Sequence, residues 1–150
     1  MMDTKTAIAL EESIAHWDEL SHVEHKTDVL IGPTHCALCR LFWHPNCAGC
    51  PVSQKSGHIG CGGTPYNYAE KSADEWSNDP ENDELRAKFR AAAIIERDFL
   101  ISLRAPKRKF WVNIYENPGW YAVWQTRDDA DSGAADYRIA CIEVTEGDGL

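Results

Sequence analysis

The chain has 150 residues, of which 43% are hydrophobic and 26% charged, and its formal net charge is −9. This composition is typical of a soluble globular protein, and it shows neither an apolar run of about 18 residues that could span a membrane nor a secretory signal. We therefore expect a chain of the reducing cytoplasm that is too acidic to bind duplex nucleic acid stably, because non-specific affinity comes from Lys and Arg on phosphates.

The first element that the sequence predicts is a helix over residues 4–25. Leu10, Ile14 and Trp17 follow the spacing i, i+4, i+7, which places them on one stripe of such a helix. The short apolar stretch 27–31 comes next, and it predicts a strand.

Five cysteines then follow in close succession: Cys36, Cys39, Cys47, Cys50 and Cys61. Two Cys-x2-Cys pairs in tandem present four thiolates to one tetrahedral ion, and zinc takes four such ligands at about 2.3 Å. The surrounding stretch 33–65 has few aliphatic residues and no acidic side chain. It cannot build a core of its own, and a zinc ion with four thiolates has a formal charge that would repel carboxylates. We predict a structural zinc site in a loop-rich module.

Several alternatives stay open at this cluster. The seven-residue gap between the two pairs is shorter than in common zinc ribbons, so either Cys47 or Cys61 can be the fourth ligand. An iron–sulfur cluster also uses four cysteines, and Cys50-Pro51 is similar to the Cys-Pro that closes some ferredoxin ligand runs. A further interpretation is that the cysteines form disulfides or remain free thiols. Cys61, with His58 nearby, is a candidate reactive thiol.

The clearest predicted helix covers residues 80–104. Asp79 or Asn78 is expected to cap it, with Pro80 at its first position. Its apolar face is expected to hold Leu85, Phe89, Ala92, Ile95, Phe99 and Leu103. The preceding stretch 66–78 has no clear periodicity, although its aromatic side chains are expected to pack on the body of the protein.

The last third of the chain is predicted to be β-rich. Strands over 109–116 and 120–127 are joined by an Asn-Pro-Gly turn, and the pattern Thr126-x-x-Asp129 predicts a short capped helix. Residues 137–144 are apolar on both faces, which is typical of a central strand.

The fold class expected is α+β, with two helices on a small, mainly antiparallel sheet and an inserted Cys-rich zinc module. We expect a single domain over residues 1–150. Its parts are an N-terminal helix and strand (1–32), the zinc module (33–68), and a helix with a hairpin, a short helix and a final strand (79–150).

The sequence offers two candidate binding surfaces. The first is an aromatic cluster on the hairpin: Trp111, Tyr115, Trp120 and Trp124. One face of the hairpin can serve a small nucleotide or a partner protein unless the N-terminal helix covers it. The second surface lies in the cysteine module, around Arg40, Trp43 and His44.

Two stretches resemble small uncharacterised phage and prophage proteins. The first reads Cys36-Ala-Leu-Cys39, Cys47-Ala-Gly-Cys50-Pro51-Val52, Gly57 and Cys61-Gly-Gly-Thr64-Pro65-Tyr66, after a Ser-Ile-x-His-Trp helix core. The second reads Val112-Asn113-Ile114-Tyr115, Thr126-Arg127-Asp128-Asp129-Ala130-Asp131 and Arg138-Ile139-Ala140-Cys141-Ile142-Glu143-Val144. The resemblance implies phage origin and a role in the bacterial cytoplasm.

We therefore expect a non-catalytic phage accessory protein with a structural zinc ion that binds a host bacterial protein, as a regulator or counter-defence inhibitor. Two alternatives compete with this reading. The chain could sequester a small nucleotide on its aromatic hairpin, or its negative charge could mimic a nucleic acid.

Overall fold

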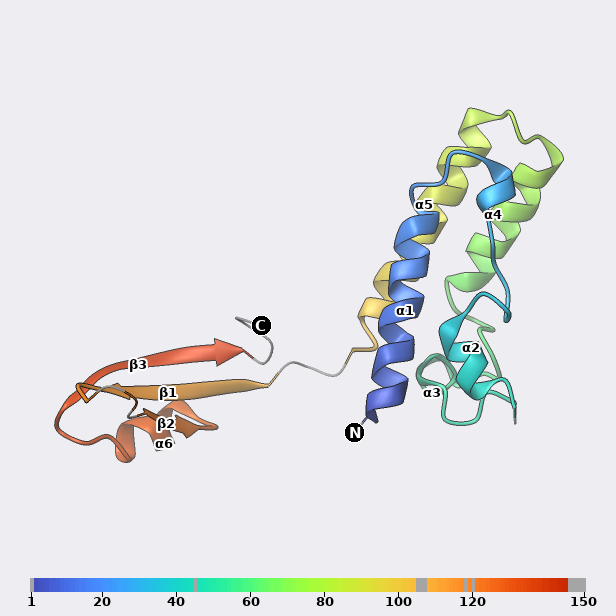
Figure 1. Cartoon of the computed structure of the whole chain (residues 1–150). Coiled ribbons are helices and arrows are strands. Elements are labelled where there is room, and N and C mark those ends of the chain that lie inside the picture. Colours follow the sequence, from blue (N-terminus) through green and yellow to red (C-terminus); the bar gives the residue numbers. More distant parts are fainter. Residues whose placement is uncertain (1, 45, 105–107, 118, 120, 146–150) are drawn as a thin grey trace. The chain divides into compact units, whose positions relative to one another are not determined.

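The computed structural model describes residues 2–44, 46–104, 108–117, 119 and 121–145 (Figure 1). The chain divides into two compact units, Met1–Ala105 and Pro106–Leu150. The first unit is helical and the second contains a three-stranded antiparallel sheet, which confirms the α+β class. That the whole chain forms one domain stays a prediction. Within the described ranges, every helix is too short or too polar to traverse a lipid bilayer.

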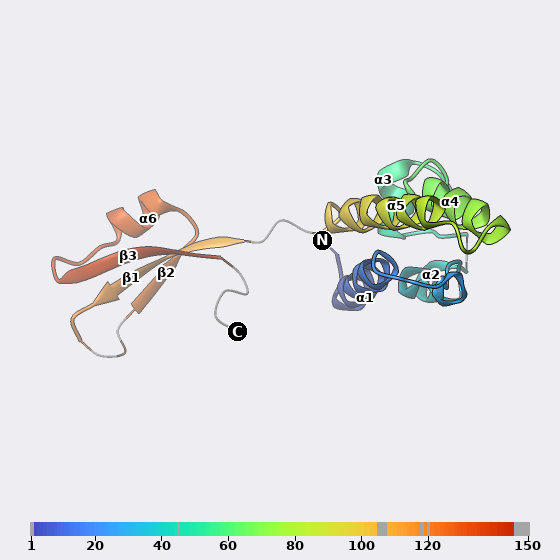
Figure 2. The ribbon, with the colours of Figure 1, turned by 90° about the horizontal axis from the view of Figure 1, so that it is seen from above.

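Three long helices form the body of the first unit, and short helices and loops connect them. In chain order the elements are α1 (Thr4–Leu20), the 3-10 helix η1 (Lys26–Asp28), α2 (Ala37–Phe42), α3 (Pro51–Ser56), α4 (Tyr66–Asn78) and α5 (Asp83–Ile101). Helix α5 packs against both α1 and α4, and α2 packs against α1 (Figure 2). The cysteine module thus lies between α1 and α4 in the sequence, and α5 joins the two long helices that flank it.

Helix α1 forms largely as its sequence predicts. Asp3 caps it, since its carboxylate accepts the backbone N–H of Thr6 at 3.0 Å. Leu10, Ile14 and Trp17 are buried, which confirms the predicted stripe, although the helix ends at Leu20 rather than at residue 25.

The strand predicted over 27–31 is wrong. Its first residues form η1, and residues 29–31 belong to no helix or strand. Val29 and Ile31 are half-buried against the helical core. The apolar character that suggested a strand therefore serves to anchor a connecting segment.

Helix α4 occupies the stretch that showed no clear periodicity. Its buried face consists of Ala69, Ser72, Ala73 and Trp76, and the small side chains leave room for α5. Trp76 is fully buried against Phe89 of α5, with ring centroids 5.9 Å apart. The four buried positions follow the helical spacing i, i+3, i+4, i+7, so the periodicity is present in the sequence, but three of them are Ala or Ser and do not stand out as apolar.

Helix α5 begins three residues later than predicted. Its cap is Asn82, whose Oδ1 accepts the backbone N–H groups of Glu84 and Leu85 at 3.0 and 3.2 Å, rather than Asp79 or Asn78. The carbonyl of Pro80 accepts the indole N–H of Trp76 at 2.9 Å, and so Pro80 belongs to the turn between α4 and α5.

The buried face of α5 also differs from the prediction at its centre. Ile95 is 49% exposed, because the stripe that faces the core is rotated toward Ala93 and Glu96. The buried residues are Phe89, Ala92, Ala93, Glu96 and Leu100. A glutamate therefore occupies the middle of an otherwise apolar stripe.

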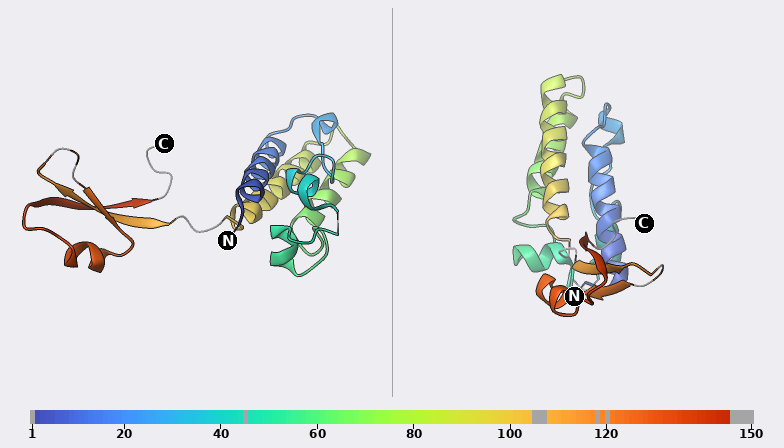
Figure 3. Two further views of the ribbon diagram at one scale, coloured as in Figure 1. Left: turned by 60° about the horizontal axis from the view of Figure 1, so that its bottom comes forward. Right: turned by 90° about the vertical axis from the view of Figure 1, so that its left-hand side faces the viewer.

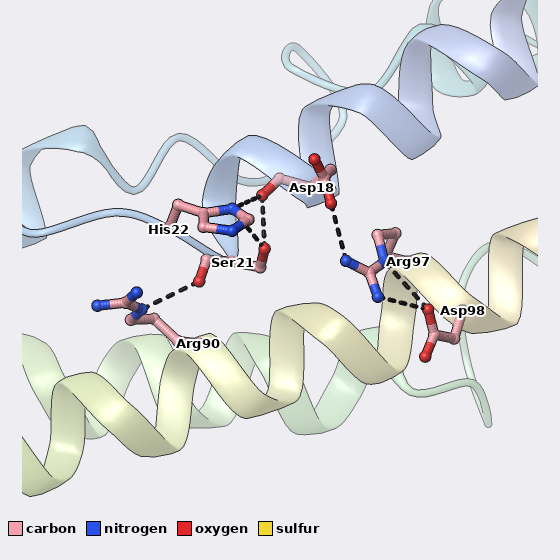
Figure 4. A network of polar contacts seen from close by, with 6 residues as sticks. All are labelled: Asp18, Ser21, His22, Arg90, Arg97 and Asp98. Carbon is pink, nitrogen blue, oxygen red and sulfur yellow. Dashed lines mark hydrogen bonds and ion pairs between the residues drawn. The ribbon is translucent and has the colours of Figure 1, made fainter.

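A seam of polar contacts joins α1 to α5. Three arginines spaced seven residues apart pair with three acids of the N-terminal region: Arg90 with Glu24, Arg97 with Asp18, and Arg104 with Glu11. Figure 4 shows Arg97 donating to Asp18 at 2.8 Å, and the Nε of Arg90 donating to the carbonyl of Ser21 at 3.0 Å. The seven-residue spacing places Arg90 and Arg97 on one side of α5, facing the N-terminal region, and Arg104 follows just after the helix ends.

The second unit contains β1 (Lys109–Tyr115), β2 (Tyr121–Trp124), α6 (Arg127–Ser132) and β3 (Arg138–Thr145), seen from another direction in Figure 3. The strand order is β2-β1-β3, and both pairings are antiparallel. The prediction that the last strand is central is therefore wrong, because β1 takes that place and β3 lies at an edge. The hairpin of β1 and β2 and the short helix are confirmed, although β2 covers Tyr121–Trp124 rather than residues 120–127. The predicted Asn-Pro-Gly turn includes Pro118, which lies outside the described residues.

Helix α6 covers one face of this sheet. Thr126 caps it as predicted, accepting the N–H of Asp129 at 3.1 Å. The side chain of Asn113 points from β1 toward α6, where it is fully buried and donates to the carbonyl of Ala130 at 2.6 Å. Arg138 of β3 completes the contact by donating to the Oδ1 of Asn113 at 3.1 Å.

Candidate metal centre

All five clustered cysteines line one cavity in the first unit, with a volume of about 140 Å³. They come from the start of α2, the turn before α3 and the loop before α4. Trp17 of α1, Tyr66 of α4 and Glu96 of α5 line it as well. The structure thus brings together the cysteines that the sequence singled out, and it adds a carboxyl group that the sequence did not.

The first Cys-x2-Cys pair is built on the start of α2. Cys36 precedes the helix and accepts the backbone N–H of Cys39 on its sulfur at 3.4 Å. Ser13 of α1 holds this turn in place, since its hydroxyl accepts the N–H of Leu38 at 3.3 Å and lies 3.9 Å from the sulfur of Cys36. The Ser-Ile-x-His-Trp core of α1 thus supports the first pair directly.

The second pair lies in a tight turn that leads into α3. Asn46 and Cys47 have positive φ angles of 51° and 58°, and Gly49 follows at 85°. Such conformations suit glycine and asparagine, which explains their presence around the pair. Cys47 and Cys50 are both buried, and Pro51 begins α3 directly after the second cysteine.

The fifth cysteine, Cys61, lies in the glycine-rich loop before α4. The hydroxyl of Thr64 donates to the carbonyl of Cys61 at 2.7 Å and so closes the loop. Gly63 has a φ of 71°, and a Cβ there would come within 2.7 Å of the His58 ring. His58 therefore packs on the loop backbone at Gly63, while Cys61 is half-buried at the cavity.

The thiols act on one another electrostatically. The hydrogen bond between Cys36 and Cys39 lowers the pKa of the Cys36 thiol to about 6 and raises the pKa of the Cys39 thiol. Burial raises the pKa of Cys50 and, to about 12, that of Cys61, and in both cases nearby cysteines add to the effect. Ionising all of these thiols together is unfavourable without a cation, and a coordinated metal ion reverses that preference.

The donor chemistry of the cavity fits a thiophilic ion such as zinc. All six cysteines of the chain are free thiols, so none of the five is consumed by a disulfide. In the described part of the chain, no three His, Cys, Asp or Glu side chains already stand in an arrangement that holds a metal ion. Coordination would therefore require the thiols to close in around the ion.

The other predicted site residues fall into two groups. Trp43 lines the cavity and is 51% exposed, and the neighbouring Arg40 and His44 are exposed. Arg40 forms an ion pair with Glu12 of α1 at 3.0 Å. This candidate surface therefore borders the cysteine cavity.

The hairpin aromatics are partly covered within their own unit. The guanidinium of Arg127 lies over the ring of Trp111, 4.9 Å from the ring centroid. Trp124 packs on Gly133, where an added Cβ would lie 2.4 Å from its ring. Tyr115 is half-buried, and Trp120 lies outside the described residues. Helix α6 and the loop after it thus occupy much of the surface that was considered for stacking.

Glu96 is the site residue that sequence reasoning missed. Only 2% of its surface is exposed. Burial, followed by the charge of Cys36, raises the pKa of its carboxyl group to about 8, while the backbone N–H of Tyr66 opposes the shift. Its position seven residues after Phe89 and four before Leu100 was the available signal, because that spacing places it on the buried stripe.

Comparisons with protein-family models, with curated proteins and with solved structures found no match.

Proposed function

We propose that this protein is a non-catalytic zinc-binding accessory protein that contacts a host bacterial protein. One observation carries the metal assignment: five cysteines from separate turns converge on a single cavity. Zinc is favoured because it accepts sulfur and oxygen ligands in a tetrahedral shell. Four protein ligands close that shell and leave no open position for a substrate, which is typical of a structural site.

A bound ion accounts for how the cysteine module holds its shape. The module contains two helices of six residues each, and helices this short are not stable by themselves. Structural zinc supplies on the order of 10–16 kcal/mol of apparent folding free energy in small zinc peptides. The segment contributes only Ala37, Leu38 and Val52, besides two cysteines, to the core of the first unit, and we infer that the ion supplies the stability that this small contribution does not.

The partner surface that we favour lies on the same module. Leu41, Trp43 and Ile59 are all exposed there, Ile59 to 77%. Large apolar side chains in water mark interaction sites when they cluster, and tryptophan is enriched among the residues that dominate binding energy. Arg40, next to Leu41 and Trp43 on the exposed side of α2, adds a polar group of the kind found at such interfaces.

Metal analysis of the purified protein tests the first part of this proposal. We expect about one zinc ion per chain and a colourless protein. A brown protein with absorption near 400 nm would show an iron–sulfur cluster instead, and a protein without metal would refute the metal assignment.

Affinity capture from bacterial lysate tests the second part. The Trp43→Ala variant is expected to retain its zinc but to lose a captured host protein that the wild-type chain binds. Tyr121→Ala, an exposed aromatic position in the second unit, is the matched control and should capture the protein normally. Equal capture by the wild-type chain and Trp43→Ala would exclude this surface.

A further inference from the structure

A buried carboxyl group faces the cysteine cavity from helix α5. Glu96 lies on the buried stripe of this helix, between Phe89 and Leu100, and it lines the same cavity as the five cysteines. Its Oε2 atom is buried and has no hydrogen-bond partner among the described residues. A carboxyl oxygen in that position is costly unless some group pairs with it.

The described wall of the cavity offers no cationic side chain to this carboxyl group. None of the described lining residues is Lys or Arg. Arg97, the next residue on α5, is engaged with Asp18 and Asp98. His16 also lines the cavity, but its Nε2 is 2.8 Å from the carbonyl oxygen of Leu30. A metal ion held by the thiols is the cation that the arrangement can still accept.

We propose that Glu96 is a ligand of this metal ion, so that the centre has mixed sulfur and oxygen coordination. The inference rests on the proposed metal site and adds a donor from outside the cysteine module. Carboxylate oxygens bind zinc at about 2.0–2.2 Å and cysteine sulfurs at about 2.3 Å, so one tetrahedral shell can hold both. Glu96 is also close enough to Cys36 and Cys61 for their charges to interact.

Coordination by Glu96 has a structural consequence. The cysteines belong to residues 36–61, whereas Glu96 belongs to α5, which packs against both α1 and α4. An ion bound both to cysteines of the module and to Glu96 would cross-link the module to the helical body. Metal binding would then fix the position of the module as well as its internal fold.

X-ray absorption at the zinc edge of the zinc-loaded full-length protein tests this proposal. The wild-type shell is expected to contain sulfur at about 2.3 Å and one oxygen at about 2.0 Å. In Glu96→Leu, which keeps much of the volume but has no oxygen donor, the oxygen should disappear, and competition with a chelator should show zinc affinity lower by about tenfold or more. Glu19→Leu, at an exposed position of α1, is the control and should match the wild type.

Two outcomes overturn the proposal. One is an all-sulfur shell in the wild-type protein, and the other is a light-atom ligand that survives unchanged in Glu96→Leu, since water or histidine would then be its source. The wild-type measurement needs no variant, so a variant that fails to fold leaves the test intact. A wild-type protein that binds no zinc would refute the proposed function itself, and this result is distinct from an all-sulfur zinc site.

Discussion

Asn113 connects three elements of the second unit through one fully buried amide. It donates to the carbonyl of Ala130 in α6 and accepts from Arg138 in β3. Arg138 also donates to Asp131 at 2.7 Å. Removal of the amide would leave the carbonyl of Ala130 with only the longer contact from Arg138, at 3.4 Å, and would leave Arg138 with one acceptor fewer. A buried polar side chain of this kind stabilises because its hydrogen bonds are complete.

We expect Asn113→Ala to destabilise the second unit by roughly 1–3 kcal/mol, because the carbonyl of Ala130 would lose the shorter of its two hydrogen bonds and Arg138 would lose one of its acceptors. Chemical denaturation monitored by tryptophan fluorescence would report the change, since Trp111 and Trp124 lie in this unit. Asn117→Ala, at an exposed position in the loop after β1, is the control and should have little effect. Equal stabilities of the two variants would contradict the role assigned to the amide.

Glu96 predicts an unusual pH dependence for the metal-free protein. Its pKa is raised from the usual 4.5 to about 8, so the folded state binds a proton that the unfolded state has already released. Stability should therefore fall as the pH rises from about 4.5 to 8, by up to about 4–5 kcal/mol from this group. Glu96→Gln should remove this slope in a denaturation series at several pH values. A wild-type slope of opposite sign, or one that the variant retains, would rule out this cause.

Residue-scale prediction succeeded where the signal is local. Thr126-x-x-Asp129 predicted the cap of α6, because a cap depends on near neighbours in the chain. The five clustered cysteines line one cavity, and that they bind a metal ion stays a prediction. Glu96 was missed because a glutamate is normally solvated. Only the packing of α5 against distant segments decides that this one is buried.

At the scale of elements, α5 organises the first unit through two different surfaces. One surface packs small residues and Phe89 against α4 and the core, and the other carries arginines toward α1. Ion pairs on an exposed surface contribute little each, about 0–1 kcal/mol. We infer that the ion pairs of Arg90, Arg97 and Arg104 with the N-terminal region set how α1 lies along α5. The apolar surface of α5 supplies most of the stability.

Two substitutions on these surfaces should differ clearly in cost. Trp76→Ala is expected to destabilise the first unit by roughly 3–5 kcal/mol, because it opens a cavity against Phe89. Arg97→Ala should cost less than about 1 kcal/mol, since it removes surface contacts with Asp18 and Asp98. Thermal unfolding followed by circular dichroism would measure both. A larger loss in Arg97→Ala than in Trp76→Ala would reverse this assignment.

Helices and strands were predictable to the extent that their signals lie within them. Helix α1 and the hairpin carry large apolar side chains at regular spacing, such as Leu10, Ile14 and Trp17, and were predicted well. Helix α4 buries mainly Ala69, Ser72 and Ala73, whose small side chains gain importance only when α5 approaches closely. The edge position of β3 could not be inferred from its composition, because strand order depends on pairing between segments rather than on either segment alone.

At the scale of the whole molecule, the two units differ in what their stability requires. The second unit contains a sheet with a short helix on one face and no clustered cysteines. The first unit combines three long helices with a module whose short helices surround five thiols. Metal removal should therefore affect the chain unevenly, and the affected region should follow the cysteines rather than the boundary between units.

Chelation is expected to increase hydrogen exchange in residues 33–65 far more than in β1 to β3 or at the centres of α1 and α5. The module loses the ion that substitutes for a core, whereas the helices keep their apolar contacts and the sheet is untouched. Cys36→Ser and Cys39→Ser should reproduce the effect without a chelator, because both cysteines belong to the two four-cysteine ligand sets, with either Cys47 or Cys61 as the fourth ligand. Cys141→Ser, in β3 of the other unit, is the matched control and should leave exchange in the module unchanged. Exchange across 33–65 that does not respond to metal removal would show that the module folds without the ion, and the cysteine cavity would then need a purpose other than structural support.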